Sequence, residues 1–99
     1  MKESQVEKYL NEQVKSIGGI TRKWSSPNRV GVPDRICFFP GGVVVFVEVK
    51  TDRGRLSVRQ ERELKELCSF GASCYVVKGA RGVNDFITKM KEIWFVKSE

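Results

Sequence analysis

Apolar residues recur at helical spacing in three segments of the chain. In residues 4–17 the apolar stripe consists of Val6, Leu10, Val14 and Ile17, and Gly18-Gly19 follows it. In the segment after Ser57 the stripe includes Leu64 and Leu67, and near the end of the chain it consists of Val83, Phe86, Ile87, Met90, Ile93 and Trp94. This spacing predicts three helices, each with one apolar side. The last stripe is broad, so it either packs entirely into the core or leaves part of its surface for a dimer.

The pattern changes to short, dense apolar runs where strands are expected. Residues 20–24 predict a short first strand, and residues 73–78 predict the last one. Between them, two apolar runs flank Pro40-Gly41-Gly42, which is typical of two strands joined by a tight turn. A helix separates the Glu48 strand from the last strand, so a right-handed parallel crossover is expected. The predicted fold is α/β, with a small mixed β-sheet flanked by helices in α-β-β-β-α-β-α order.

The predicted hairpin carries three charged residues at its open end. Asp34 lies at the start of the first strand, and Glu48 and Lys50 lie near the end of the second. Side chains alternate along a strand, so Glu48 and Lys50 project from the face opposite the valines at 43, 45, 47 and 49. Burying charges in so apolar a strand is costly unless they are compensated. A divalent cation between the two carboxylates, with the ammonium beside it, would compensate them.

The same residues carry a family resemblance. Val32-Pro33-Asp34, a spacer and Glu48-Val49-Lys50 resemble the PD-(D/E)XK nuclease signature. The neighbouring residues narrow the resemblance to the VRR-NUC family of virus-type replication-repair nucleases; they are Gly31, Arg35, Pro40-Gly41-Gly42, Phe46, Gly54, Leu56-Ser57 and Gln60. The match is strong over residues 31–60, and the order of elements fits from about residue 3 to residue 95. The resemblance implies a restriction-endonuclease-like core.

The resemblance also implies roles for individual residues. Asp34 and Glu48, together with the Val49 carbonyl, would bind Mg²⁺, for which Mn²⁺ could substitute. Lys50 would place or activate the attacking water and stabilise the transition state. A glutamate of the first helix is expected to reach the metal; Glu7 is preferred and Glu3 is the alternative. Glu7 also fits a simpler role as the capping-box partner of Ser4, and the spacing leaves both open.

Gln60 has two interpretations as well. It stands three residues after Ser57, the spacing of a capping box at the start of the second helix. It also shares a face with Leu64 and Leu67, so it is expected to point towards the sheet. The resemblance gives it a supporting role, holding the catalytic lysine or a metal-bound water. The charged residues at 61, 62, 63, 65 and 66 are expected to be mostly solvated.

Composition adds a partner and excludes several function classes. The 99 residues, 40% of them hydrophobic, suit a single domain over residues 1–99. The net charge of +6 and the pI near 9.5 favour a polyanionic partner, although ordinary solubility charge is the alternative. The expected DNA contacts are Arg22, Lys23, Arg29, Arg35, Arg53 and Arg55. Among those that precede the Pro33-Asp34 strand, the resemblance favours Lys23, because the family tends to carry a lysine there. The chain has no His, which excludes His-dependent nuclease chemistries.

Other features bear on the compartment. No apolar run approaches the roughly 20 residues of a membrane span, and the N-terminus does not resemble a signal peptide. Cys37, Cys68 and Cys74 lack zinc-ligand spacing, so they are expected to be small core residues of a reduced protein. These observations predict a cytoplasmic location; with the resemblance, they predict a viral or prophage protein acting in its bacterial host.

Together these points predict a Mg²⁺-dependent, structure-selective DNA endonuclease. The resemblance suggests a homodimer that acts on four-way (Holliday) junctions. No association with a membrane is expected. A flap or general nicking nuclease in phage replication or repair is one alternative. A non-catalytic DNA-binding module is another, and a purely structural Glu48–Lys50 salt bridge is the last.

Overall fold

The chain folds into a four-stranded sheet with helices on both faces. The computed structural model describes the backbone of residues 1–98 and the side chains of residues 1–93. In chain order the elements are α1 (Glu3–Ser16), β1 (Ile20–Lys23), β2 (Arg35–Phe39), β3 (Val43–Lys50), α2 (Val58–Ser69), β4 (Cys74–Lys78) and α3 (Gly79–Ser98). This order confirms the predicted α/β fold. The expectation for Trp94 lies outside the described side chains.

The strands are arranged in the order β1-β2-β3-β4. β1 pairs with β2 and β2 with β3 in antiparallel fashion, whereas β3 and β4 are parallel, as the crossover through α2 requires. The β2–β3 hairpin closes with Phe39 opposite Val43. Gly41 and Gly42 in this turn have φ values of 85° and 78°, which other residues rarely adopt.

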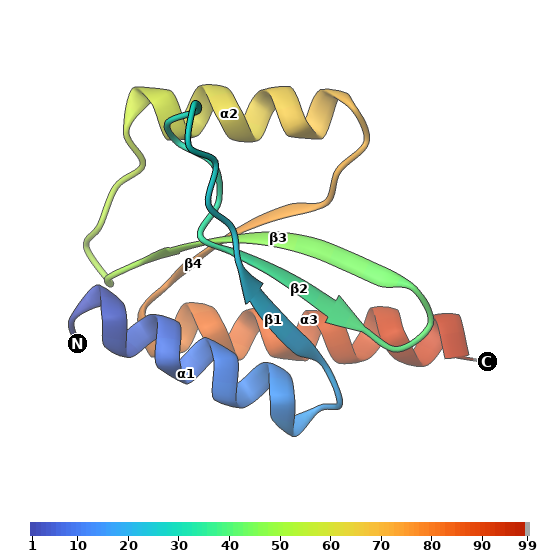
Figure 1. Cartoon of the computed structure of the whole chain (residues 1–99). Helices are drawn as coiled ribbons and strands as arrows, with labels where there is room; N and C mark the ends of the chain where they lie inside the picture. Colours follow the sequence, from blue (N-terminus) through green and yellow to red (C-terminus); the bar gives the residue numbers. More distant parts are fainter. Residues whose placement is uncertain (99) are drawn as a thin grey trace.

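The hydrophobic core lies between the sheet and the α1–α3 layer, while α2 lies on the opposite face (Figure 1). The sheet contributes Cys37, Phe39, Val43, Val45, Val47, Val49 and Val77, and the helices contribute Val6, Leu10, Val14, Val83, Phe86, Ile87 and Met90. The odd-numbered valines of β3 therefore all point into the core, as alternation predicts. Val83, Phe86, Ile87 and Met90 of α3 are buried in the same core, so these four residues are not free for a dimer surface.

The sheet face towards α2, here called the open face, is less apolar. β3 presents Val44, Phe46, Glu48 and Lys50 to it, and the ring of Phe46 packs against Trp24 with a centroid distance of 5.2 Å. Ile20, Phe38 and Val44 lie opposite one another on β1, β2 and β3 and are exposed. The open face thus has an exposed apolar row at one end and the charged end of β3 at the other.

The first helix begins differently from the prediction. Its N-cap is Lys2, whose backbone N–H donates to Gln5 Oε1 at 2.6 Å, so Ser4 and Glu7 do not form the expected capping box. Ser4 lies inside the first turn instead, because the N-cap is two residues earlier than expected. The predicted end at Gly18-Gly19 is consistent with the structure, where Gly18 has a φ of 89°.

Two other expectations were wrong in part. Glu63 was expected to be solvated but is 7% exposed, because α2 turns it towards the 24–34 loop, where Arg29 Nε donates to its Oε1 at 2.7 Å. Cys37 is a core residue as expected, and burial raises its pKa to about 12. Cys68 is exposed at the end of α2, however, and Cys74 is only half-buried beside it. All three cysteines are free thiols.

Across residues 1–98, no helix combines the length and the apolar content that crossing a membrane requires.

Candidate active site

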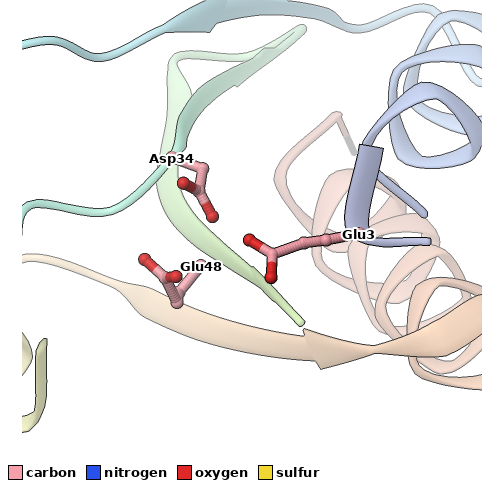
Figure 2. A group of neighbouring side chains, drawn as sticks. All are labelled: Glu3, Asp34 and Glu48. Atoms are coloured by element: carbon pink, nitrogen blue, oxygen red, sulfur yellow. The ribbon is translucent and has the colours of Figure 1, made fainter. Parts of the chain in front are cut away.

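Three carboxylates converge at the charged end of β3. Glu3 comes from the first turn of α1, Asp34 immediately precedes β2, and Glu48 lies on β3. One carboxylate oxygen of each lies within 4.8 Å of the others, and Figure 2 shows the three groups pointing toward one another. Like charges at this spacing repel, so the cluster has the donor set and the electrostatic need that a hard divalent cation would satisfy.

Asp34 is held by the backbone on both sides. Its Oδ2 accepts a hydrogen bond of 2.8 Å from the backbone N–H of Val49, which joins the two ends of the hairpin. Its own carbonyl accepts a hydrogen bond of 3.0 Å from the Trp24 N–H, which continues the β1–β2 pairing. The predicted proximity of Asp34 to the Glu48–Lys50 end is therefore present in the structure.

Glu48 is 1% exposed, which is unusual for a carboxylate. Its desolvation and the neighbouring Asp34 charge raise its pKa to about 8, and Lys50 opposes this shift. Lys50 Nζ lies 3.6 Å from Glu48 Oε2, so both side chains project from the same face as predicted. A group that is this costly to ionise by itself is a natural cation ligand, because a bound cation would offset the cost.

Gln60 forms the capping box and also points towards the sheet, where its amide contacts Glu48 and not Lys50. Its Oε1 accepts from the Ser57 N–H at 2.9 Å while its own N–H donates to Ser57 Oγ at 3.1 Å, which is the capping box. Its Nε2 donates to Glu48 Oε2 at 3.0 Å. Because the cap engages the amide oxygen, the amide nitrogen faces Glu48. The start of α2 thereby holds the carboxylate in one orientation.

Glu7, the preferred helix carboxylate, lies elsewhere. Its Oε2 pairs with Arg35 Nη1 at 3.2 Å and with Lys23 Nζ at 3.4 Å. Arg35 Nη2 also donates to Thr21 Oγ1 at 2.7 Å, so this network ties α1 to β1 and β2. Among the described residues, the carboxylate that α1 brings to Asp34 and Glu48 is Glu3. Glu3 is one helical turn nearer the N-terminus, and the N-terminal end of α1 lies beside the end of β3 (Figure 1).

The sequence held a partial signal for this arrangement. Lys23 and Arg35 are direct partners in the β1–β2 register, so folding places two cations side by side. Such a pair needs a carboxylate, and Glu7 supplies it. Whether Glu3 or Glu7 pairs with these cations depends on how far α1 is shifted along its own axis relative to the sheet. The helical period of the sequence does not determine that shift.

The six expected DNA contacts fall into two groups. Arg29, Arg35 and Lys23 form ion pairs, Arg29 with Glu63 and with Glu66 at 2.9 Å. Their charges are therefore partly neutralised by ion pairs that link different elements of the fold. The exposed cations Arg22, Arg53 and Arg55 form no ion pair within the described residues. Sequence reasoning did not distinguish the groups, because the pairing partners lie on distant segments.

Comparison with known proteins gives a consistent result. The family model described as "VRR-NUC domain" matches residues 2–81. A protein of Acyrthosiphon pisum secondary endosymbiont phage 1, named "Putative nuclease p44", is 39% identical over 77 residues, which is 78% of this chain and 83% of that protein. A solved structure titled "VRR_NUC domain" has a TM-score of 0.82 and 33% identity, covering 89% of this chain and 96% of that one. Another, "VRR_NUC domain protein", has a TM-score of 0.67 at 14% identity over 92% of this chain and 86% of that one, which supports the fold alone.

Proposed function

The chain belongs to the VRR-NUC domain family of nucleases, and on that basis we propose that it is a divalent-metal-dependent DNA endonuclease. The observation that carries the proposal is the Glu3–Asp34–Glu48 cluster with Lys50 beside it. These oxygen donors suit Mg²⁺, and Mn²⁺ would be accepted by the same ligands. The Val49 carbonyl is proposed as a further oxygen ligand, and Glu7 is replaced by Glu3 as the ligand from α1.

Hydrolysis of a phosphodiester needs a water aligned with the leaving oxygen and stabilisation of charge on the phosphoryl group. A divalent cation bound to the carboxylates would supply most of that stabilisation and would make water a better nucleophile. Lys50 provides a positive charge where the phosphate is expected to lie, and it can hold the attacking water. Gln60 keeps Glu48 facing the site, and the Val49 N–H does the same for Asp34.

The finer part of the proposal concerns the substrate. Selection by the shape of the DNA, rather than by its base sequence, is part of this proposal. We propose a homodimer that presents two sites to opposite strands of a four-way junction. The competing proposal is a flap or general nicking nuclease of phage replication. Cleavage of four-way junction, flap and linear DNA, measured side by side, distinguishes the two.

The test of the activity is a cleavage assay with wild type, Asp34→Ala and Lys50→Ala. Wild type should cut DNA with Mg²⁺ and stop when EDTA is added. Each variant should lose more than about 100-fold in rate while remaining folded and still able to bind DNA. Unchanged cleavage in a folded Asp34→Ala protein, or cleavage that ignores EDTA, would contradict the proposal. DNA binding without any cleavage by wild type would instead indicate a non-catalytic binding module.

Glu3 and Glu7 form a matched pair for testing the ligand set. Glu3→Gln removes a proposed ligand, so it should reduce the rate by about 100-fold and raise the Mg²⁺ concentration needed for half-maximal activity. Glu7→Gln removes only the ion pairs to Lys23 and Arg35, so it should change the rate by less than about tenfold and lower thermal stability instead. The reverse ranking, at equal folding, would restore Glu7 as the ligand from α1.

A further inference from the structure

A hollow on the open face adjoins the catalytic cluster on the side away from Asp34. Its volume is about 650 Å³, and it is lined by Arg55, Leu56, Glu61, Val76 and Lys78. That size lies within the usual range of roughly 300–1,000 Å³ for small-ligand sites. Lys78 belongs to β4 and was not singled out by any sequence pattern.

Each wall of this hollow adjoins a catalytic group. On β4, Val76 is the register partner of Glu48 and Lys78 is the partner of Lys50, so each pair lies about 4.8 Å apart across the strands and on one face. On α2, Glu61 directly follows Gln60, whose amide holds Glu48.

The third wall is the loop that follows β3, which folds back over Lys50. A Cβ atom at Gly54 would lie 3.1 Å from the Cβ of Lys50. Arg55 and Leu56 therefore start from a point in contact with the catalytic lysine. All three walls thus place the hollow immediately beside the site at which the phosphodiester would be cut.

The charges and the floor of the hollow fit a nucleotide. Lys78 and Arg55 are exposed, and neither forms an ion pair within the described residues, unlike Lys23, Arg29 and Arg35. Glu61 is the single acid of the lining, so the lining carries a net positive charge. Leu56 and Val76 add an apolar surface against which a sugar or base can pack. A strand of DNA can use both features, because its phosphates bind cations and its sugars or bases pack against an apolar surface.

We propose that this hollow binds the nucleotide next to the cleaved bond, with Lys78 and Arg55 contacting its phosphate. The proposal rests on the nuclease function proposed above. It makes Lys78 a positioning residue: it would align the strand so that the scissile phosphate falls between Lys50 and the carboxylates, without touching the reacting atoms.

The binding test compares Lys78→Gln with Lys91→Gln, which removes an exposed lysine of α3, on the other side of the sheet. DNA affinity is measured by fluorescence anisotropy in EDTA over a range of salt. Loss of one phosphate contact should flatten the plot of log K against log salt by about 0.9, which corresponds to about eightfold weaker binding at 0.1 M salt and about twofold at 0.5 M. Lys91→Gln should match wild type, and Lys78→Arg should restore the slope.

The cleavage test uses a substrate in which one phosphate at a time is a neutral methylphosphonate. At one position beside the cut, the modification should weaken DNA binding by wild type at least as much as Lys78→Gln does. It should weaken binding by Lys78→Gln less than binding by wild type, because only the Arg55 contact is then left to lose. The effect should appear in KM or in binding more than in kcat. Additive losses at every position, an unchanged salt slope, or equal behaviour of Lys78→Gln and Lys91→Gln would overturn the proposal.

These outcomes separate the two proposals. If wild type binds DNA but cuts none of the substrates, the nuclease function fails while the binding test still decides the role of Lys78. If wild type cuts DNA and Lys78→Gln behaves like Lys91→Gln, only the nucleotide site fails. A chain that neither binds nor cuts DNA would overturn both.

Discussion

At the scale of single residues, Glu48 concentrates the electrostatic cost of the site. It is almost completely buried, it faces Asp34 and Glu3, and its near partners are one ammonium and one amide. Burial with incomplete pairing favours the protonated carboxyl, which is why the pKa of Glu48 rises from 4.5 to about 8. Protons and divalent cations should therefore compete for this group.

This competition predicts how the stability of the metal-free protein depends on pH. The folded state keeps the Glu48 proton up to about pH 8, whereas the unfolded chain releases it near pH 4.5. Between these values the folded state binds more protons, so the free energy of unfolding should fall as pH rises, by up to about 1.4 kcal/mol per pH unit from this group. Denaturant titrations in EDTA should show that fall in wild type and a smaller one in Glu48→Gln.

Added Mg²⁺ provides the complementary measurement. The cation replaces the proton, so the rise in unfolding temperature on adding Mg²⁺ should be larger at pH 9 than at pH 6. Glu48→Gln should lose most of that rise at both pH values. A wild-type stability profile that coincides with that of Glu48→Gln would show that Glu48 is not the titrating group.

At the scale of elements, the start of α2 couples folding to the site. The Ser57–Gln60 capping box begins the helix and also orients Gln60 towards Glu48. The Arg29–Glu63 ion pair holds the same helix against the 24–34 loop. Gly31 lies in this contact with a φ of 92°, and a Cβ there would come within 2.9 Å of the Arg59 carbonyl oxygen, so the loop and the helix backbone touch. The position of Gln60 thus depends both on the cap at Ser57 and on the contacts of the first turns of α2 with the 24–34 loop.

Two serines test the role of the cap. Ser57→Ala removes the acceptor for the Gln60 N–H and should lower the free energy of unfolding by about 1 kcal/mol. It should also reduce the cleavage rate, because the first turn of α2, which carries Gln60 to Glu48, is held less firmly without this hydrogen bond. Ser4→Ala, which was the cap expected from sequence for α1, should change stability by less than about 0.5 kcal/mol. Equal effects of the two substitutions in chemical denaturation would show that the cap at α2 is not special.

At the scale of the whole molecule, the proposed homodimer needs an apolar surface. The described residues of the α3 stripe are buried in the core, except for the half-buried Ile93, so they do not provide one. The row of Ile20, Phe38 and Val44 is exposed across three strands of the open face. This row is the surface on which we expect the second copy to pack.

Sedimentation at micromolar concentration should therefore show a dimer for wild type and a shift towards monomer for Phe38→Glu. Phe70→Glu is the matched control, since Phe70 is 85% exposed just beyond the end of α2 and is not one of the three residues of the row, and it should leave the dimer intact. Wild type should cut a four-way junction faster than a linear duplex of the same sequence, and Phe38→Glu should reduce that preference. A monomeric wild type, or equal cutting of both DNAs, would contradict the proposed junction activity.

Much of the fold and part of the site followed from the chain read in one dimension. The alternation in β3 placed Glu48 and Lys50 on one face, the turn at Gly41-Gly42 returned the chain so that Asp34 joins them, and the Ser57–Gln60 spacing began α2. These relations span few residues, and backbone geometry with a period of 2.0 or 3.6 residues determines them.

The remaining features were decided by tertiary structure. The choice of Glu3 over Glu7, the pairing of Arg29 with a buried Glu63, and the placement of Lys78 beside Lys50 all join segments far apart in the chain. Each depends on how a helix is shifted along its axis relative to the sheet, or on which strand becomes the neighbour of β3. The packing of the whole core sets these positions, because a helical or strand period repeats along its element and does not mark where that element meets another.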